Sequence, residues 1–294
     1  MILNEFIIPE ITSDIPHGDM PGDVIKINDD HIKKASLIFP LLINEINKLN
    51  KDKIVVSVFG GSGVGKSEIA SILAYYFNAN NINTYIMSGD NYPYRIPLHN
   101  DEERLSIFRK SGKQALVDTK QYENIKTLLN DLINKDLDSD TKQITNYPFL
   151  KEYQQAGREA LKKYLGTYQE IDYDKVNDII NQFKNNEDVI SFKRMGRKEN
   201  EIYYESIDTS CVKVLIVEWT HGGSKYLNGI DIPILLNSTP EETKAHRLLR
   251  ARDGNVDSCF TTMVLEIEQE ELDRRREFAK IVISKKGEIL KEKK

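Results

Sequence analysis

Eight consecutive residues of this chain, GGSGVGKS, have the composition and spacing of a phosphate-binding loop. The glycines let successive backbone N–H groups turn toward one anion, and a helix that begins here would add its unpaired amides. Lys66 can reach the outer phosphates, and the Ser67 hydroxyl is placed to coordinate the magnesium that accompanies them. An empty glycine-rich turn is the alternative, disfavoured by eight matching positions. The predicted cradle comprises Gly60, Gly61, Ser62, Gly63, Val64, Gly65, Lys66 and Ser67.

Two carboxylates follow predicted strands and are candidates for the chemistry beside this loop. Asp90 lies in the segment SGDNY, directly after the second strand, and Glu218 ends the third strand. Ligands of open parallel sheets lie at the carboxyl ends of the strands, so both acids are expected near the phosphates. We predict that Asp90 is the base that accepts a proton from an acceptor hydroxyl, and that Glu218 is the metal-side acid with Ser67. The alternative for Asp90 is a turn residue that only caps local amides.

Basic and aromatic residues after Asp90 are candidates for substrate contacts. We predict substrate binding by Tyr92, Tyr94, Arg95, His99, Arg104, Arg109 and His221. A helix that begins near Pro240 places Arg247 and Arg250 on one face, and a lid is expected to begin at Arg252. We predict that Arg250 and Arg252 neutralise charge on the transferred phosphoryl group, against the alternative that they only complement the helix dipole.

The elements that must position these residues follow from hydrophobic periodicity. Strands are predicted at 53–59, 84–87, 212–217, 232–236 and 280–284, and a helix at 68–77 directly follows the phosphate loop. The strand, helix, strand order is typical of a parallel sheet. The sequence therefore predicts an α/β class, with a three-layer P-loop NTPase fold and a mostly helical insertion.

Residues 1–52 are predicted to be an N-terminal appendage with a helix near 30–49, and residues 53–294 to be the P-loop domain. Within it, residues 96–205 form an insertion that is charged and mostly helical in pattern, with a hairpin near 195–199. This insertion is long enough to build a substrate or lid lobe. The terminal segment KKGEILKEKK is expected to be a frayed, solvated end.

Composition excludes several classes of partner. The 41 basic and 46 acidic residues give a net charge of −5, which argues against binding of nucleic acid or anionic lipid. No apolar run is long enough to cross a membrane, and the N-terminus lacks the pattern of a secretory signal. Cys211 and Cys259 are too few for a disulfide framework or a metal cluster, so a reducing, cytoplasmic setting is expected.

Together, GGSGVGKS, the Asp90 segment, EWTHGG and HRLLRARD resemble the phosphoribulokinase/uridine kinase family of P-loop kinases over about residues 53–110 and 205–285. The resemblance implies ATP and Mg²⁺ as cofactors, Asp90 as base, and a lid that begins within Arg250 to Asp253. Glu218 is followed by Trp219 where that family often has glycine. The implied activity is transfer of the terminal phosphoryl group of ATP to a hydroxyl of a small molecule, a nucleoside or a sugar (phosphate).

Other functions stay open at this stage. The segment Ser88 to Asn91, followed by Arg95, also resembles the Gly-Asp-Asn motif of adenylylsulfate kinases, which implies the 3′-hydroxyl of adenylylsulfate as a rival acceptor. A nucleotide-hydrolysing switch or a nucleotide sensor belongs to a different class, and neither needs an acceptor. The acceptor and the oligomeric state, with a homo-oligomer as one option, are not determined by the sequence.

Overall fold

A six-stranded sheet forms the centre of the part of the chain described by the computed structural model, which comprises residues 5–12, 14–250 and 258–292. The strand order is β2-β5-β1-β6-β7-β8, and all neighbours are parallel except β7 and β8. The strands are β1 Ile54–Gly60, β2 Thr84–Ser88, β5 Val214–Glu218, β6 Ile232–Asn237, β7 Ile281–Ser284 and β8 Ile289–Glu292. The five predicted strands are confirmed. The end expected to be frayed instead supplies β8, which pairs antiparallel with β7 and shields that edge of the sheet.

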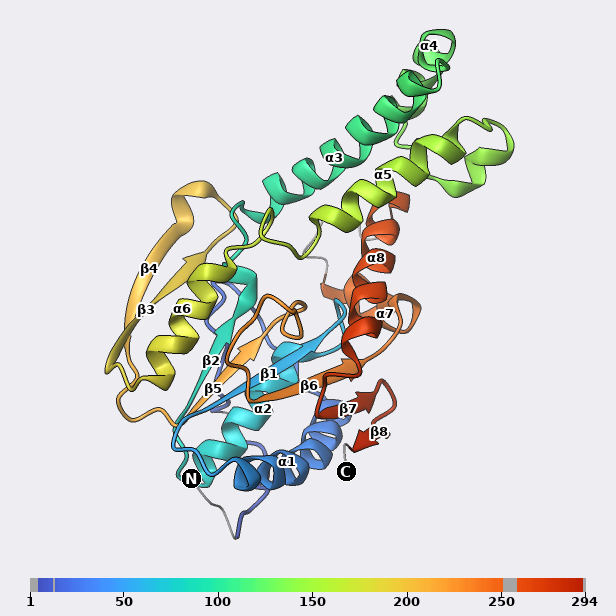
Figure 1. The fold of residues 1–294 in the computed structure, drawn as a ribbon. Coiled ribbons are helices and arrows are strands. Elements are labelled where there is room, and N and C mark those ends of the chain that lie inside the picture. The colour runs from blue at the N-terminus through green and yellow to red at the C-terminus, as the bar shows by residue number, and fades with distance from the viewer. Residues whose placement is uncertain (1–4, 13, 251–257, 293–294) are drawn as a thin grey trace.

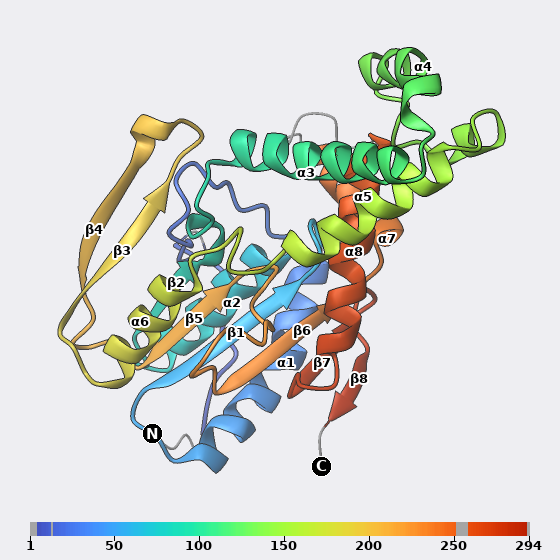
Figure 2. The same ribbon diagram turned by 45° about the horizontal axis from the view of Figure 1, so that its top comes forward.

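Helices cover both faces of the sheet, as the views in Figures 1 and 2 show. Side chains of a strand alternate between faces. Val56 and Val58 of β1 therefore pack toward α1 (Asp29–Leu49) and α2 (Lys66–Ala79), whereas Phe59 packs toward α8 (Cys259–Arg275). On the same side as α8, α6 (Tyr173–Lys184) covers the β2 and β5 end. The predicted three-layer α/β arrangement is confirmed.

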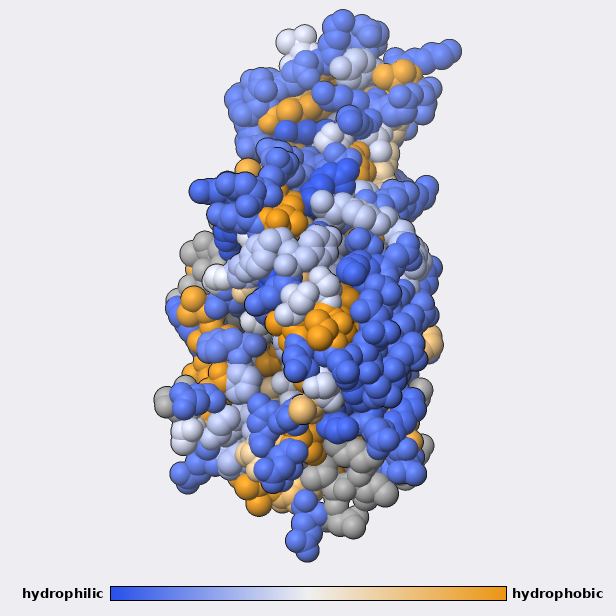
Figure 3. Space-filling view, turned by 90° about the vertical axis from the view of Figure 1, so that its left-hand side faces the viewer, coloured by the Kyte–Doolittle hydropathy of each residue, from blue (hydrophilic) through white to orange (hydrophobic). Residues whose placement is uncertain are grey.

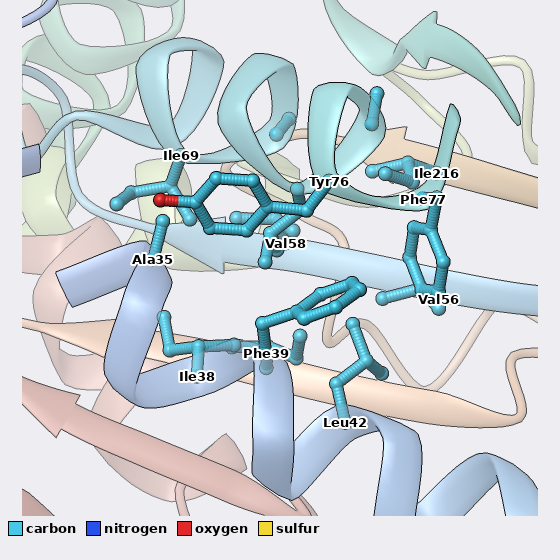
Figure 4. Close-up of a cluster of buried hydrophobic side chains, with 14 of the residues drawn as sticks. Ala35, Ile38, Phe39, Leu42, Val56, Val58, Ile69, Tyr76, Phe77 and Ile216 are labelled. Carbon is cyan, nitrogen blue, oxygen red and sulfur yellow. The ribbon is translucent and has the colours of Figure 1, made fainter. Parts of the chain in front are cut away.

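Helix α1 belongs to the main hydrophobic core, although its sequence position suggested an appendage. Its apolar residues Ala35, Ile38, Phe39 and Leu42 recur at helical spacing and are fully buried. The Phe39 ring meets that of Phe77 of α2 edge-on at 5.1 Å between centroids, in the cluster shown in Figure 4. Full burial of one such side chain stabilises the fold by about 1.5–3 kcal/mol. Helix α1 therefore supports the layer that carries the phosphate loop.

The segment before α1, residues 5–28 apart from 13, is here called the N-terminal strap. It begins beside the end of α2, where the Ile7 amide donates to Asn80 Oδ1 at 2.8 Å and Asn80 Nδ2 donates to the Ile7 carbonyl at 2.9 Å. Tyr75 donates to the Glu10 carbonyl at 3.1 Å. At its other end Asp19 reaches Ser88, where β2 ends. The strap thus runs from the end of α2 to the carboxyl end of β2.

The insertion is built from two parts. A helical lobe projects from the sheet and contains α3 (Pro97–Asp118), α4 (Tyr122–Asn134) and α5 (Leu150–Tyr164) (Figure 1). The second part contains α6 and a two-stranded antiparallel hairpin, β3 (Val189–Met195) with β4 (Ile202–Asp208), whose connection spans the predicted hairpin position. Figure 3, which views the molecule from the hairpin side, shows an elongated outline with a mostly hydrophilic surface.

The last helix before the gap in the described residues is α7 (Pro240–Arg250). Its predicted start is confirmed, because Thr239 and Glu242 form reciprocal side-chain to backbone hydrogen bonds of 2.8 and 3.3 Å. Short 3₁₀ turns at Gly89–Asn91, Thr141–Thr145 and Glu199–Glu201 complete the elements. Among the described helices, none has the length and apolar character needed to span a bilayer.

Candidate active site

The phosphate loop connects β1 to α2 in the conformation that an anion cradle needs. Gly63 and Gly65 have φ angles of 74° and 100°, in the region that favours glycine. A Cβ on Gly63 would lie 2.9 Å from Arg247 Cγ, and one on Gly65 would lie 2.8 Å from His31 Nε2. Lys66 begins α2 and donates from Nζ to the Gly61 carbonyl at 3.2 Å. The loop therefore presents backbone, one ammonium group and a helix N-terminus to the same space.

The sheet register brings the two predicted carboxylates to the edge where this loop begins. Glu218 is paired with Ser88 of β2 on one side and with Val58 of β1 on the other. Asp90 follows Ser88 in the short turn Gly89–Asn91 and is exposed, whereas Glu218 is only 5% exposed. The cradle, the buried acid and the exposed acid thus come from three neighbouring strands of one sheet.

Trp219, which stands where the resembled family often has glycine, packs onto the Asp90 turn. A Cβ on Gly89 would lie 2.1 Å from Trp219 Cδ2, so only glycine fits at position 89. The indole is 1% exposed and lies 5.6 Å from the Tyr173 ring and 5.4 Å from the His221 ring, centroid to centroid. The large Trp219 side chain after Glu218 therefore fits because residue 89, on the turn against which it packs, is glycine.

A charged network lies beside the cradle, between the helical lobe and α8. Arg104 contacts Glu170 at 2.7 Å and Glu268 of α8 at 3.8 Å, and Glu170 also accepts from the Gly166 amide at 2.6 Å. Burial acts to raise the pKa of Glu170, but the charge of Arg104 and the hydrogen bond from the Gly166 amide help to hold it below its usual range. Burial raises the pKa of Glu268, with Arg104 opposing this effect. Burial lowers the pKa of His221 to about 4, so its imidazole is neutral at pH 7.

A cavity of about 400 Å³ opens along this network. Phe59 lies at its floor on β1, His221 and Thr220 belong to the loop after β5, and Glu268 belongs to α8. A small recess of about 10 Å³ beside Gly61 and Ser62 is also lined by Glu268. Because Glu268 borders both spaces, the cavity and the phosphate loop meet at this side chain.

The predicted substrate residues are divided between the cavity and structural contacts. His221 lines the cavity, and Arg104 lies behind it in the network with Glu170. Tyr92 is fully buried under the hairpin and accepts from the Lys193 amide at 3.4 Å. Elsewhere, Tyr94 is 50% exposed, Arg95 donates to Tyr164, and His99 faces Glu199. Arg109 is paired with Asp136 and Asp138 within the lobe, 3.0 Å from each.

The predicted lid arginines are only partly described. Arg252 lies outside the described residues, and nothing is described of the Arg250 side chain. Arg247, one turn earlier on α7, donates from Nη1 to the Pro240 carbonyl at 2.8 Å, and its side chain passes over Gly63.

Three acidic residues of this edge were missed by the sequence analysis: Glu170, Glu268 and Asp19. Glu268 lies in the acid-rich run LEIEQEELDRR, where no periodicity distinguishes it from its neighbours. Asp19 lies in a stretch rich in proline, glycine and aspartate, which is typical of a loop. The signal for all three residues is tertiary, because their partners are far away in the sequence.

The residues at the strand ends fit a nucleotide with magnesium. The cradle leaves no room for side chains at positions 63 and 65, Ser67 ends the loop motif, and the buried Glu218 ends the neighbouring strand β5. Within the described ranges, no group of three or more His, Cys, Asp or Glu side chains is arranged to hold a metal ion. Magnesium at a nucleotide needs only one or two protein ligands, since phosphates and waters supply the others.

This chain is similar to proteins that are described as kinases. Over 258 residues, or 88% of the chain, it is 35% identical to the bifunctional alpha-galactosidase/sucrose kinase AgaSK of Mediterraneibacter gnavus, and it spans 23% of that protein's length. D-glycerate 3-kinase from Cryptococcus neoformans aligns over 90% of this chain and 98% of its own, with 10% identity and a TM-score of 0.48. A protein described as a fructose transport system kinase from a Silicibacter species aligns over 84% of this chain and 94% of its own, with 13% identity and a TM-score of 0.47. No protein-family model matches the chain.

Proposed function

We propose that this protein is an ATP-dependent kinase of the phosphoribulokinase/uridine kinase type, which transfers the γ-phosphoryl group to a hydroxyl of a sugar. One observation carries the proposal: a phosphate cradle, a buried acid and an exposed acid lie at one edge of the sheet through the pairing of Glu218 with Val58 and Ser88. The similarity to AgaSK supports it, because the shared segment contains a phosphate loop and therefore corresponds to the kinase portion of that bifunctional name.

In this proposal each group has a defined role. The cradle amides and Lys66 bind the polyphosphate and orient the γ-phosphorus. Asp90 accepts the proton of the acceptor hydroxyl while that oxygen bonds to the γ-phosphorus and the bond to the bridging oxygen breaks, releasing ADP. Ser67 and Glu218 would hold Mg²⁺, which neutralises charge on the phosphates when bound.

The cavity is the proposed acceptor site. Its volume of about 400 Å³ lies within the usual range for small-molecule sites, about 300–1,000 Å³. Glu268 and Glu271 can accept hydrogen bonds from sugar hydroxyls, and the Phe59 ring offers an apolar surface. Three of its cations are paired, since Arg274 and Arg275 contact Glu271 at 3.3 and 2.7 Å and Lys162 contacts Glu270 at 3.0 Å. These features favour a neutral sugar over a phosphorylated one.

The two described cysteines, Cys211 and Cys259, are free thiols, which is compatible with the reducing, cytoplasmic setting that we propose.

The test is an acceptor panel with ATP and magnesium. Formation of ADP is measured with sucrose, monosaccharides, sugar phosphates, uridine, adenylylsulfate and no acceptor, and phosphorylated products are identified by mass spectrometry. We expect ADP formation that depends on a neutral sugar. Preference for adenylylsulfate would support the rival indicated by Ser88 to Asn91, and equal turnover without any acceptor would indicate a nucleotide-hydrolysing switch. Either result contradicts the proposal.

A further inference from the structure

The carboxylate of Asp19, in the N-terminal strap, accepts four hydrogen bonds at the turn that carries Asp90. Oδ1 accepts from the Ser88 amide at 2.7 Å and from Asn91 Nδ2 at 3.0 Å. Oδ2 accepts from Arg194 Nη1 at 2.8 Å and from the Tyr85 hydroxyl at 3.1 Å. One side chain from the strap therefore joins β2, the turn after it and the hairpin.

Two of these donors flank the proposed base. Ser88 and Asn91 bracket the turn Gly89–Asn91, in which Asp90 is the central residue. Asn91 extends the connection, because its Oδ1 accepts from the Met195 amide of β3 at 2.9 Å. Because Asp90 is part of this turn, a shift of the turn would move its carboxylate.

The other two donors tie the same carboxylate to the hairpin. Arg194 contacts Asp19, donates to the Tyr85 hydroxyl at 2.8 Å, and pairs with Glu205 of β4 at 2.9 Å. The side chains of Asp19 and Arg194 are only 6% and 4% exposed. Asp19 and Arg194 thus form a buried ion pair whose members make further hydrogen bonds, and not a pair on the surface.

We infer that Asp19 is a positioning residue for the reaction: its carboxylate holds the turn so that Asp90 faces the acceptor hydroxyl. This inference rests on the proposed function. It also assigns a role to the strap, which supplies a residue for catalytic geometry from a segment that precedes the phosphate loop in the sequence.

The protonation behaviour of this site supports a functional role. Burial raises the pKa of Asp19 to about 6, against the opposing effect of Arg194. The groups that face it are Tyr85, Tyr92, Arg194 and, beyond Arg194, Glu205. The pKa of Arg194 and of both tyrosines is raised, so these three keep their usual charge state near pH 6. A raised pKa means that the ionised form lowers the stability of the folded state, although it is the form that can accept all four hydrogen bonds.

The first test is the variant Asp19→Asn. The asparagine side chain has nearly the shape of aspartate and keeps one acceptor oxygen, but it places an NH₂ group against the donors of Arg194 and Tyr85. We expect kcat to fall about 10- to 100-fold, since a displacement of about 1 Å can cost about 10²-fold, with unchanged affinity for a nonhydrolysable ATP analogue. Asp14→Asn is the matched control, because Asp14 is an exposed residue of the same strap and should leave kcat unchanged.

The second test measures tryptophan fluorescence and does not depend on enzymatic turnover. Trp219 is the single tryptophan of the chain and packs on Gly89 of the same turn, so its fluorescence reports the position of the turn. We expect the emission of the wild type to change with pH around 6 and that of Asp19→Asn to lack this step. A change near pH 4 would instead belong to His221, which neighbours the indole.

Opposite pH dependences separate positioning from a purely structural role. Between pH 4 and 6 the folded state binds the proton of Asp19 more tightly than the unfolded state, so the free energy of unfolding should fall as pH rises. Over the same window, kcat should rise.

Wild-type kcat in Asp19→Asn, or loss of nucleotide affinity together with kcat, would overturn the inference. If Asp19→Asn does not fold, Tyr85→Phe removes one of the four donors and should give a smaller loss in the same direction. Failure of every acceptor would refute the proposed kinase activity but leave the fluorescence test of the turn intact.

Discussion

At the scale of single residues, the site depends on close contacts that exclude larger side chains and direct the few polar ones. Gly89 exists as glycine because Trp219 occupies the space beside it, and Gly65 because His31 of α1 lies against it. These contacts define where Asp90 and the phosphate loop lie. In the proposed reaction, the chemistry depends on two side chains, Asp90 and Lys66.

Substitution of these two side chains should separate chemistry from binding. Asp90→Asn removes the proposed base, so kcat should fall about 10²- to 10⁴-fold while nucleotide affinity is retained. Lys66→Ala removes the ammonium group of the cradle, so both kcat and affinity should fall. Steady-state kinetics and calorimetric titration with an ATP analogue measure the two quantities. An Asp90→Asn enzyme with full turnover would show that this carboxylate is not the base.

At the scale of elements, the lobe depends on the packing of α3 against α5. Gly157 of α5 faces Phe108, and Gly112 of α3 faces Tyr153, with Cβ positions only 2.4 and 2.5 Å from the respective rings. The two rings meet edge-on at 5.4 Å between centroids. Small residues therefore let two helices approach closely around an aromatic pair.

Gly157→Ala should destabilise this lobe, although alanine has the higher helix propensity. The propensity alone would stabilise the helix by about 1 kcal/mol, whereas overpacking against Phe108 should cost about 1–3 kcal/mol. Hydrogen exchange should therefore quicken in α3 and α5 and stay unchanged in α2. Gln155→Ala, at an exposed position of α5, serves as the control. Slower exchange in α5 of the Gly157→Ala protein would contradict this packing.

At the scale of the whole molecule, ion pairs connect the lobe to the helix that lines the cavity. Arg158 of α5 contacts Glu266 at 2.9 Å and Glu270 at 2.7 Å on α8. Lys162 contacts the same Glu270 at 3.0 Å. Together with the Arg104 network, these pairs bring the lobe against the proposed acceptor site.

Arg158→Ala should weaken acceptor binding without affecting the nucleotide. Partly exposed ion pairs contribute about 0–1 kcal/mol each, so loss of two should raise the acceptor KM by up to about 30-fold. The dissociation constant of the ATP analogue should not change. Lys135→Ala is the control, because its pair with Asp131 at 2.7 Å lies at the C-terminal end of α4 and does not connect the lobe to α8. An equal effect of both variants on KM would refute the role of the connection between lobe and α8.

The sequence by itself determined the phosphate loop, the five parallel strands, the start of α7 and the helical character of the insertion. These features are local. A motif of eight residues, a run of apolar residues and a capping box can each be recognised within a short segment of the sequence. The position of Asp90 and Glu218 at the same edge also followed, because parallel strands end on one side.

Only the tertiary structure decided which polar residues meet at that edge. Arg104 and Arg109 were both predicted to bind substrate, yet Arg104 lies in the network beside the cavity and Arg109 is paired within the lobe. Asp19 reaches a turn 69 residues away, and Glu268 faces Arg104 from the far end of the chain. Such pairings depend on how helices and loops pack over the sheet, and local periodicity carries no information about contacts between segments so distant in sequence.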